Sequence, residues 1–274
     1  MMSSLKEIIQ EYGLAPKKSL GQNFILDFNL LRRIVKSAHL SKGDTVIEVG
    51  PGPGGLTSAI LESDVDALVS IEKDSRCIKA LKNTILDPRF TLLEADALNF
   101  DYTSLPHTKL KIIANLPYNI STILLVDWLK IIQRFESLTL MFQKEVAQRI
   151  VAKPGSKDYG RLSVITQWVC SPKVLFDLSP EAFTPSPKVF SSIVHFTPLR
   201  KSLEVPFETM ELITRSAFGT RRKMLRSSLK TLTLHADKLL EMCGIDPTLR
   251  AERLEVSDFI KLAQGYLKMN ENAQ

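Results

Sequence analysis

Residues 45–55 read TVIEVGPGPGG, and this stretch decides the fold that the sequence predicts. Residues 45–49 have the character of a buried strand, and four glycines follow within the next six positions. Glycines let a backbone turn sharply and approach a ligand closely. Because residues 56–61 then resemble a helix, the stretch indicates a βα unit that binds a ligand at its turn.

Short apolar runs and amphipathic segments alternate around this turn. Strands are expected at residues 45–49, 67–71, 90–93, 111–114 and 138–142, with helices near 56–61, 78–85 and 121–132. Asp27 is expected to cap an earlier helix. The alternation predicts a Rossmann-like α/β fold with a mostly parallel sheet covered on both faces. Two further runs, 173–178 and 189–196, form a hairpin-like pair, so the last strand is expected to be antiparallel.

The pattern changes after Pro198, because the residues that follow show helical spacing alone. We therefore expect two domains, an α/β domain over residues 1–198 and a small all-α domain over residues 199–274. Neither internal repeats nor low-complexity tracts interrupt them.

Composition narrows the class of protein. The 274 residues contain 44% hydrophobic and 24% charged residues, which is ordinary for a globular protein, and no apolar run approaches the ~20 residues of a membrane span. The three cysteines form no CxxC, and the four histidines lack metal-ligand spacing, so we expect a reducing compartment and no metal. Residues 1–13 do not resemble a secretory signal, which favours the cytoplasm. The net charge of +6 permits a polyanionic partner.

Asn115-Leu116-Pro117-Tyr118 follows the strand expected at 111–114. Because Pro117 cannot continue a strand ladder, these residues are expected at the sheet edge, where α/β folds bind ligands. The Asn115 side-chain oxygen and the Leu116 carbonyl suit the two N–H bonds of an exocyclic amine on adenine or cytosine. Tyr118 offers a face on which a flipped-out base stacks. A strand followed by an ordinary Pro turn fits these four residues equally well.

Acidic residues end the neighbouring strands. The Gly-rich turn also fits the dinucleotide pattern GxGxxG, which leaves a nicotinamide cofactor open. Glu72 ends the second strand, where a carboxylate accepts ribose hydroxyls, and Asp96 follows the third, where it suits an adenine amine. A nicotinamide enzyme has no need of the amine-positioning Asn115. Since S-adenosylmethionine (AdoMet) is cationic at sulfur, several acceptors at successive strand ends favour it as the cofactor.

Taken as a set, these motifs resemble the small-subunit rRNA adenine N6,N6-dimethyltransferases, relatives of the large-subunit erythromycin-resistance methyltransferases. The resemblance covers about Leu20 to Phe259. It rests on LGQNF at 20–24, the turn at 48–54, Glu72, Asp96, NLPYN at 115–119 and FTPSPKV at 183–189. It implies AdoMet-dependent dimethylation of N6 of two adjacent adenosines in a hairpin near the 3′ end of small-subunit (16S) rRNA. It also implies that the rRNA is methylated within an assembling 30S subunit, and therefore that the protein has a role in ribosome biogenesis.

The resemblance implies site residues as well. The expected AdoMet-binding residues are Asn23, Ile25, Gly50, Gly52, Glu72, Asp96 and Asn115. The target adenine is expected against Asn115, Leu116 and Tyr118, and Phe183 resembles the family's second stacking residue, opposite Tyr118. By its position alone, Phe183 is better explained as a core aromatic before a Pro-rich turn. We expect direct in-line methyl transfer without a covalent enzyme intermediate.

Residues 215–230, which we name the basic segment, hold six cations and no acid. Arg222, Arg226 and Lys230 recur every four residues and are predicted to share one helix face, with Leu225 and Leu229 facing inward. This charge favours phosphate contact over a merely solvated face. The predicted RNA-binding residues are Arg221, Arg222, Lys223 and Arg226, with Lys17, Lys18, Lys153, Lys157 and Arg161 as further candidates.

Other functions remain open on the sequence. They are a large-subunit rRNA adenine methyltransferase, a DNA adenine N6-methyltransferase, an rRNA-binding assembly factor with little catalysis, and, more distantly, a nicotinamide-dependent dehydrogenase. Residues 218–225 and 250–254 resemble the small-subunit family and not the resistance enzymes. A DNA enzyme's motif usually begins with Asp in place of Asn115. Nothing in the sequence suggests an obligate dimer, so we expect a monomer.

Overall fold

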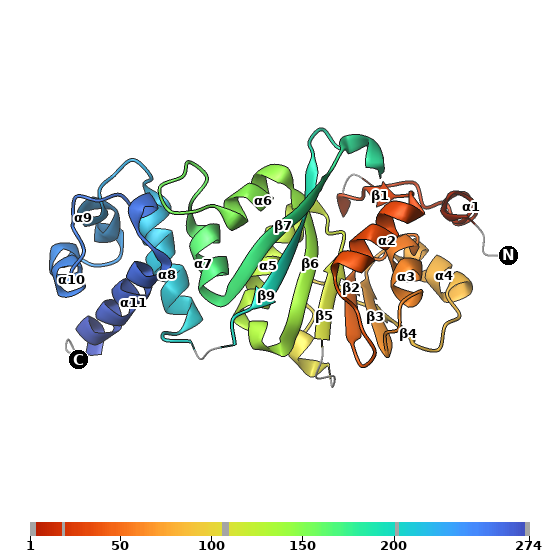
Figure 1. Cartoon of the computed structure of the whole chain (residues 1–274), viewed down its shortest axis with the longest axis horizontal. Helices are drawn as coiled ribbons and strands as arrows, with labels where there is room; N and C mark the ends of the chain where they lie inside the picture. The colour runs from red at the N-terminus through yellow and green to blue at the C-terminus, as the bar shows by residue number, and fades with distance from the viewer. Residues whose placement is uncertain (1–3, 18–19, 106–109, 201–202, 272–274) are drawn as a thin grey trace. The chain divides into compact units, whose positions relative to one another are not determined.

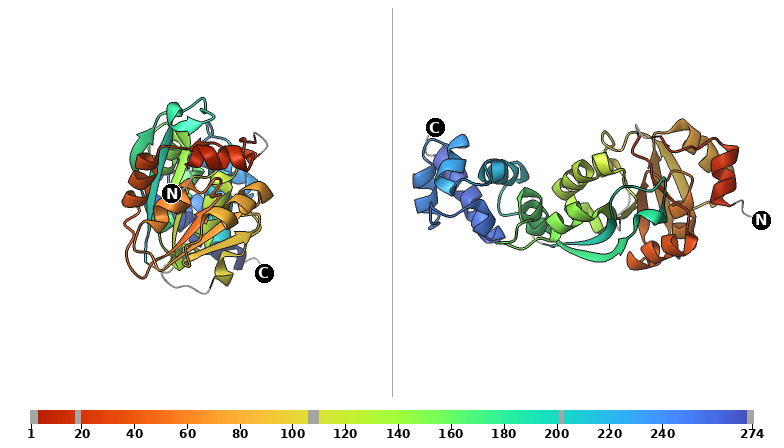
Figure 2. Two further views of the ribbon diagram at one scale, coloured as in Figure 1. Left: turned by 90° about the vertical axis from the view of Figure 1, so that its right-hand side faces the viewer. Right: turned by 90° about the horizontal axis from the view of Figure 1, so that it is seen from above.

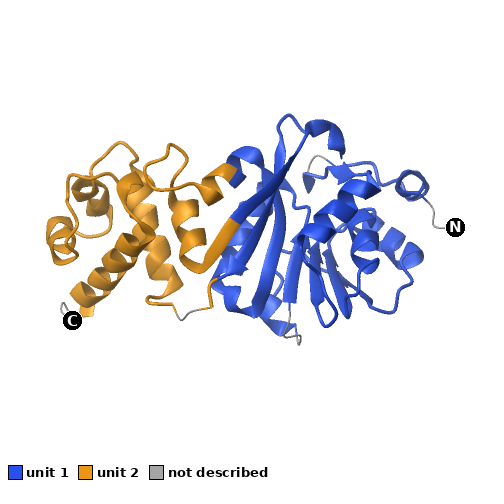
Figure 3. Ribbon diagram, in the orientation of Figure 1, with its two compact units in different colours: residues 1–147, 173–198 blue, residues 148–172, 199–274 orange. Residues whose placement is uncertain are grey.

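The computed structural model describes residues 4–17, 20–105, 110–200 and 203–271 (Figure 1). Lys18 therefore lies outside the described residues. The chain divides into two compact units, residues 1–147 with 173–198 and residues 148–172 with 199–274 (Figure 3). The predicted first domain included residues 148–172, whereas they group with the second unit. The reason is that α7 (Arg161–Val169) packs against α8 (Phe207–Gly219) and α11 (Val256–Glu271).

The first unit is built on a seven-stranded sheet, counted over the described residues, with the order β4-β3-β2-β5-β6-β9-β7. The strands are β2 (Thr45–Val49), β3 (Ala67–Glu72), β4 (Phe90–Glu94), β5 (Leu110–Ala114), β6 (Phe135–Gln143), β7 (Cys170–Leu178) and β9 (Ser191–Pro198). The pairs from β4 through β6 are parallel, and β9 is antiparallel to β6. The last strand is thus antiparallel, as predicted, but it lies between β6 and the edge strand β7.

Helices cover this sheet on both faces. They are α2 (Phe28–Ser37), α3 (Gly55–Leu61), α4 (Ser75–Thr84) and α5 (Tyr118–Lys130), while α1 (Leu5–Glu11) packs through Ile8 against Cys77 and Ala80 of α4, and α6 (Lys144–Val151) follows β6. Leu31 and Ile60 of α2 and α3 share one buried cluster with Ile113 and Met141 of the sheet. Because side chains alternate along a strand, Ile112 and Leu140 face the other side, where Trp128 of α5 is fully buried. Figures 1 and 2 show α2 and α5 on opposite sides of the strands.

Asp27 caps α2 as predicted. Its carboxylate accepts hydrogen bonds from the backbone N–H groups of Asn29 and Leu30, which have no partner inside the helix. Leu31, Ile34 and Val35 then fall on one buried face at helical spacing. The cap therefore fixes where the chain leaves the pocket-lining segment before α2.

A two-stranded sheet joins two segments that are distant in sequence. β1 (Phe24–Ile25) pairs antiparallel with β8 (Phe183–Thr184), so Ile25 lies opposite Phe183. Strands this short carry no periodicity, and the sequence pattern did not predict the pairing. As a result, the end of LGQNF at 20–24 and the start of FTPSPKV at 183–189 meet in one small sheet.

The second unit is helical, with α7, α8 and α11 joined by α9 (Leu225–Ser228) and α10 (Ala236–Met242). Tyr159, Phe218 and Phe259 form an aromatic chain in its core. Trp168 packs on Phe207 and donates its indole N–H to Glu204 at 3.1 Å. Leu225 and Leu229 are buried, as predicted.

The prediction that Arg222, Arg226 and Lys230 share one helix face is wrong, because Arg222 lies outside any helix. α8 ends at Gly219, and α9 begins only at Leu225, after an extended Met224. The N–H groups of Leu225 and Arg226 bond to the carbonyls of Leu249 and Pro247, at 2.7 and 3.1 Å. These tertiary bonds replace the bonds that a continuous helix would make, so Arg222, Arg226 and Lys230 do not share one helix face.

Across the described part of the chain, no helix is both long and apolar enough to cross a membrane.

Candidate functional site

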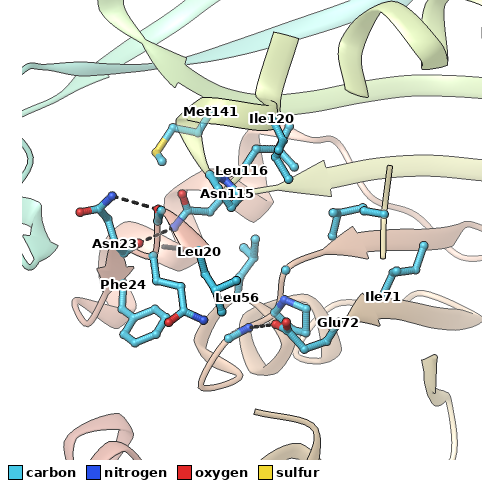
Figure 4. Close-up of a pocket in the computed structure, with 18 of the residues that line it drawn as sticks. Leu20, Asn23, Phe24, Leu56, Ile71, Glu72, Asn115, Leu116, Ile120 and Met141 are labelled. Carbon is cyan, nitrogen blue, oxygen red and sulfur yellow. Dashed lines mark hydrogen bonds between the residues drawn. The ribbon is translucent and has the colours of Figure 1, made fainter. Parts of the chain in front are cut away.

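A pocket in the first unit lies at the carboxyl ends of β2, β3 and β5 (Figure 4). It is lined by nine of the residues named from the sequence: Asn23, Ile25, Gly50, Gly52, Glu72, Asp96, Asn115, Leu116 and Tyr118. The carboxyl ends of adjacent parallel strands meet at one edge, which is why the residues from Gly50 to Tyr118 converge here, whereas Asn23 and Ile25 come from the separate segment that contains β1. Phe183 does not line the pocket.

The Gly-rich turn forms the floor between β2 and α3. Gly50 has a φ of 70° and donates its N–H to the Ile71 carbonyl at 2.9 Å. A Cβ at Gly50 would meet nothing within 4 Å, whereas one at Gly52 would lie 3.0 Å from the Phe24 ring. Gly50 therefore leaves open space for a ligand, and Gly52 admits the aromatic ring of the N-terminal segment.

Glu72 ties this turn to the end of β3. One carboxylate oxygen accepts the Gly52 N–H at 3.2 Å, and the other accepts those of Lys73 and Asp74 at 2.8 and 2.9 Å. Burial raises the pKa of Glu72, and these backbone bonds act in the opposite direction. The side chain is thus held rigidly, and its oxygens retain lone pairs for the hydroxyl groups of a ligand.

Glu48 lies beneath the turn and was not named as a site residue. It is fully buried, and one of its oxygens accepts the hydroxyls of Thr57 and Ser70 at 2.8 and 2.7 Å. Burial raises the pKa of Glu48 to about 7. Its other oxygen has no hydrogen-bond partner among the described residues. The sequence did contain a signal for Glu48, because an acid interrupts the otherwise apolar strand at residues 45–49.

Asp96 approaches the pocket after β4. Its carboxylate accepts the Leu98 N–H at 3.1 Å and lies 3.3 Å from the Lys73 ammonium group. The backbone bond from Leu98, together with the contact to Lys73, lowers the pKa of Asp96. Asp96 is therefore an ionised acceptor, and it remains more accessible than Glu72.

Asn115 is oriented by the N-terminal segment. Its side-chain nitrogen donates to the Asn23 carbonyl at 3.2 Å, so the amide oxygen points away from that contact (Figure 4). Leu116 is buried beside it. The first N–H groups of α5, from Ile120 and Ser121, bond to the Pro117 carbonyl and leave that of Leu116 outside the helix. The two residues with the predicted acceptor oxygens therefore follow each other directly at the end of β5, and both line the pocket.

α5 begins at Tyr118, three residues earlier than predicted, because Pro117 occupies the N-cap position and presets the backbone. The Tyr118 hydroxyl lies 2.6 Å from the Ser191 hydroxyl of β9. Burial raises the pKa of Tyr118, which keeps the phenol protonated. The ring thus has a fixed place in the pocket wall.

Phe183 lies in the buried core cluster, with 3% of its surface exposed. Tyr118 packs against the same cluster. The structure thus favours the explanation of Phe183 as a core aromatic, and a stacking role for its ring stays a prediction.

The predicted RNA-binding residues lie in the second unit. Arg221, Arg222, Lys223 and Arg226 are all exposed. Arg221 donates to the Lys157 carbonyl and lies 3.5 Å from a Glu252 oxygen. The basic segment and the loop of Lys153 and Lys157 are therefore joined at Arg221.

Over the described residues, no three His, Cys, Asp or Glu side chains gather as metal ligands would. The pocket instead supplies oxygen acceptors, a glycine floor and an aromatic wall. Such a set suits an adenosine-containing ligand next to a second, planar group.

Comparisons with known proteins agree with this arrangement. The profile of a family described as ribosomal RNA adenine dimethylase matches residues 13–268. The chain is 48% identical to the ribosomal RNA small subunit methyltransferase A of Rhodospirillum rubrum, covering 95% of this chain and 91% of that protein. It is 49% identical to the protein of the same name from Rhizobium etli, with 95% and 96% covered. A crystal structure of a dimethyladenosine transferase from Plasmodium falciparum superposes with a TM-score of 0.76 at 28% identity, covering 89% of this chain and 96% of that one.

Proposed function

The chain belongs to the ribosomal RNA adenine dimethylase family and is an rRNA adenine dimethyltransferase, and we propose that it uses AdoMet on small-subunit rRNA. Its substrate would be two adjacent adenosines in a hairpin near the 3′ end of 16S rRNA, within an assembling 30S subunit. The names of the Rhodospirillum and Rhizobium relatives support the choice of subunit. We also propose that it acts as a monomer in the cytoplasm.

The orientation of the Asn115 amide is the observation that carries the proposal. The amide nitrogen is committed to the Asn23 carbonyl, which leaves the oxygen to accept an N–H bond from a base. The neighbouring Leu116 carbonyl accepts the second N–H bond. Two acceptors in these positions pull the N6 hydrogens to one side, so that the nitrogen lone pair is directed to the other. A delocalised amine is a poor nucleophile, and this pyramidal geometry restores its reactivity.

The residues of the pocket fit AdoMet. When bound, AdoMet supplies an electrophilic methyl group on a sulfonium. Glu72 would accept the ribose hydroxyls and Asp96 the adenine amine, while the missing side chain at Gly50 leaves room for close approach. Asn23, Ile25 and Gly52 would complete the wall.

Among the described residues, no cysteine lines the pocket, and Cys77 is fully buried outside the lining. The pocket therefore supports direct transfer from donor to amine, without a covalent enzyme intermediate. The described residues contribute positioning and hydrogen-bond acceptors.

One labelling experiment tests the proposed function. Labelled AdoMet is incubated with the protein and with under-methylated small subunits, naked 16S rRNA, large subunits or DNA. We expect label in N6,N6-dimethyladenosine of small-subunit rRNA, with the assembling subunit as the preferred form. Label in large-subunit rRNA or DNA alone would overturn the substrate, and a lack of label on every nucleic acid would favour an assembly factor.

A further inference from the structure

We propose that Ser191 is a positioning residue that holds the Tyr118 ring in place as the wall against which the target adenine stacks. This inference rests on the proposed function, because it assigns a role within that adenine site. Ser191 does not line the pocket and comes from a strand that none of the recognised motifs includes.

Tyr118 is anchored at both ends of its side chain. Its backbone is the first residue of α5, directly after Pro117 at the N-cap. Its hydroxyl lies 2.6 Å from the Ser191 hydroxyl, and the body of the ring packs against the cluster that contains Met141 and Ile193. The hydroxyl oxygen lies on the axis about which χ2 turns, so the bond to Ser191 fixes the direction in which the ring axis points, while the apolar side chains packed against the ring restrict its plane.

The sheet order explains why Ser191 can reach the adenine site. Tyr118 follows β5, and β6 lies between β5 and β9. Ser191 is the first residue of β9 and lies opposite Gln143, the last residue of β6. Because β9 is antiparallel to β6, it begins at the sheet edge where β5 and β6 end. The Tyr118 side chain can therefore reach Ser191 past the end of β6.

The neighbouring serine provides an internal comparison. Ser192 is as buried as Ser191, but successive side chains of a strand point to opposite faces. The Ser192 hydroxyl donates to Asp177 at 2.7 Å, away from the pocket. If Ser191 served only to stabilise β9, removing either hydroxyl would have similar consequences.

A double-mutant cycle on Tyr118 and Ser191 tests the proposal, with Ser192→Ala as the matched control. The variants are Ser191→Ala, Tyr118→Phe and the double variant, and Tyr118→Phe keeps the ring while losing the same bond. Turnover and KM are measured on under-methylated small subunits, AdoMet affinity by calorimetry, and Tm by thermal unfolding.

We expect Ser191→Ala and Tyr118→Phe each to lower kcat by roughly 3- to 10-fold, with AdoMet affinity unchanged. The double variant should be no slower than either single variant, because all three lose one shared bond. Ser192→Ala should keep the wild-type kcat. If Ser191→Ala fails to fold, Tyr118→Phe still reports the loss of the bond from the other side.

Three results would overturn the proposal. They are multiplicative losses in the double variant, a wild-type kcat for Tyr118→Phe, or a loss for Ser192→Ala equal to that for Ser191→Ala. Each of these can occur while the wild-type protein methylates rRNA normally. Failure of this inference is therefore distinguishable from failure of the proposed function, in which the wild-type protein itself would not label rRNA.

Discussion

The pocket of the first unit and the basic segment of the second unit differ in how far their charged side chains are exposed to solvent. In the pocket, Glu48 and Glu72 are 0% and 7% exposed and accept hydrogen bonds from the protein itself. In the basic segment, Arg222 and Lys223 are exposed to solvent. Buried interactions are screened little by salt, whereas exposed charges are screened strongly. Pocket variants should therefore have large effects that salt does not change, and variants of the basic segment should have small effects that salt does change.

The largest expected effect is that of Asn115→Ala. Losing one acceptor at a polar transition state costs about 2–4 kcal/mol, so turnover should fall by about 30- to 900-fold. AdoMet binding should largely persist, because Glu72 and the Gly-rich turn remain. Single-turnover rates at low and high salt measure the loss of turnover, and calorimetry measures the affinity for AdoMet. Asn99→Ala, an exposed residue outside the pocket lining, is the control. A turnover near that of wild type would remove Asn115 from its assigned role.

The next effect concerns the pH dependence of stability. The pKa of Glu48 is about 7 in the folded protein, above its ordinary value of 4.5, so the folded state holds its proton longer than the unfolded chain. This contribution to stability is fully present below pH 4.5 and is lost as the pH rises to about 7, by at most about 3 kcal/mol.

The variant Glu48→Gln isolates that contribution. Denaturant unfolding of both proteins across this pH range should show wild type losing stability relative to Glu48→Gln as the pH rises. Parallel stability curves would mean that the carboxyl of Glu48 does not titrate as its burial implies.

Glu72→Ala should weaken AdoMet binding by about 1.5–3 kcal/mol, since a charged hydrogen-bond acceptor is lost. Glu94 provides the control, because it lies directly opposite Glu72 in the sheet but is exposed and does not line the pocket. Calorimetry should show weaker binding for Glu72→Ala and wild-type affinity for Glu94→Ala. Equal affinities for the two variants would exclude Glu72 as the ribose ligand.

The smallest effect is expected in the basic segment. The double variant Arg222→Ala/Lys223→Ala should bind rRNA more weakly and lower the slope of log affinity against log salt by about 1.5, since two phosphate contacts are lost. AdoMet affinity should not change. Lys42→Ala, an exposed cation of the first unit, is the control. An unaltered salt dependence would mean that Arg222 and Lys223 do not contact the RNA phosphates.

The same contrast explains how much could be predicted from the sequence. The convergence of Glu72, Asp96 and Asn115 was predictable, because each ends or follows a parallel strand and such ends share one edge. In the basic segment, Arg222, Arg226 and Lys230 were predicted to share one helix face from their spacing. That prediction failed because the chain leaves helical structure after Gly219 and resumes it only at Leu225, where the N–H groups of Leu225 and Arg226 bond to the carbonyls of Leu249 and Pro247. Local spacing does not register such tertiary bonds.

Other features lay beyond sequence reasoning for a related reason. Opposing Ile25 to Phe183 requires strands of two residues each, which are too short for any period. The contact of Ser191 with Tyr118 depends on β9 lying between β6 and β7, and the hairpin-like spacing of the last two strands gave only its antiparallel direction. Placing residues 148–172 in the second unit depended on which helices bury the faces of α7.

The position of β9 also constrains the order in which this protein matures during its own synthesis. The outer edge of β6 stays unpaired while the nascent chain extends through α6, α7 and β7, and it is satisfied only when residues 191–198 have emerged. An unpaired edge is a template for wrong pairing, so this interval is when the chain most needs protection. The described residues that line the pocket have all been translated by Met141, whereas the hydroxyl partner of Tyr118 emerges only with Ser191.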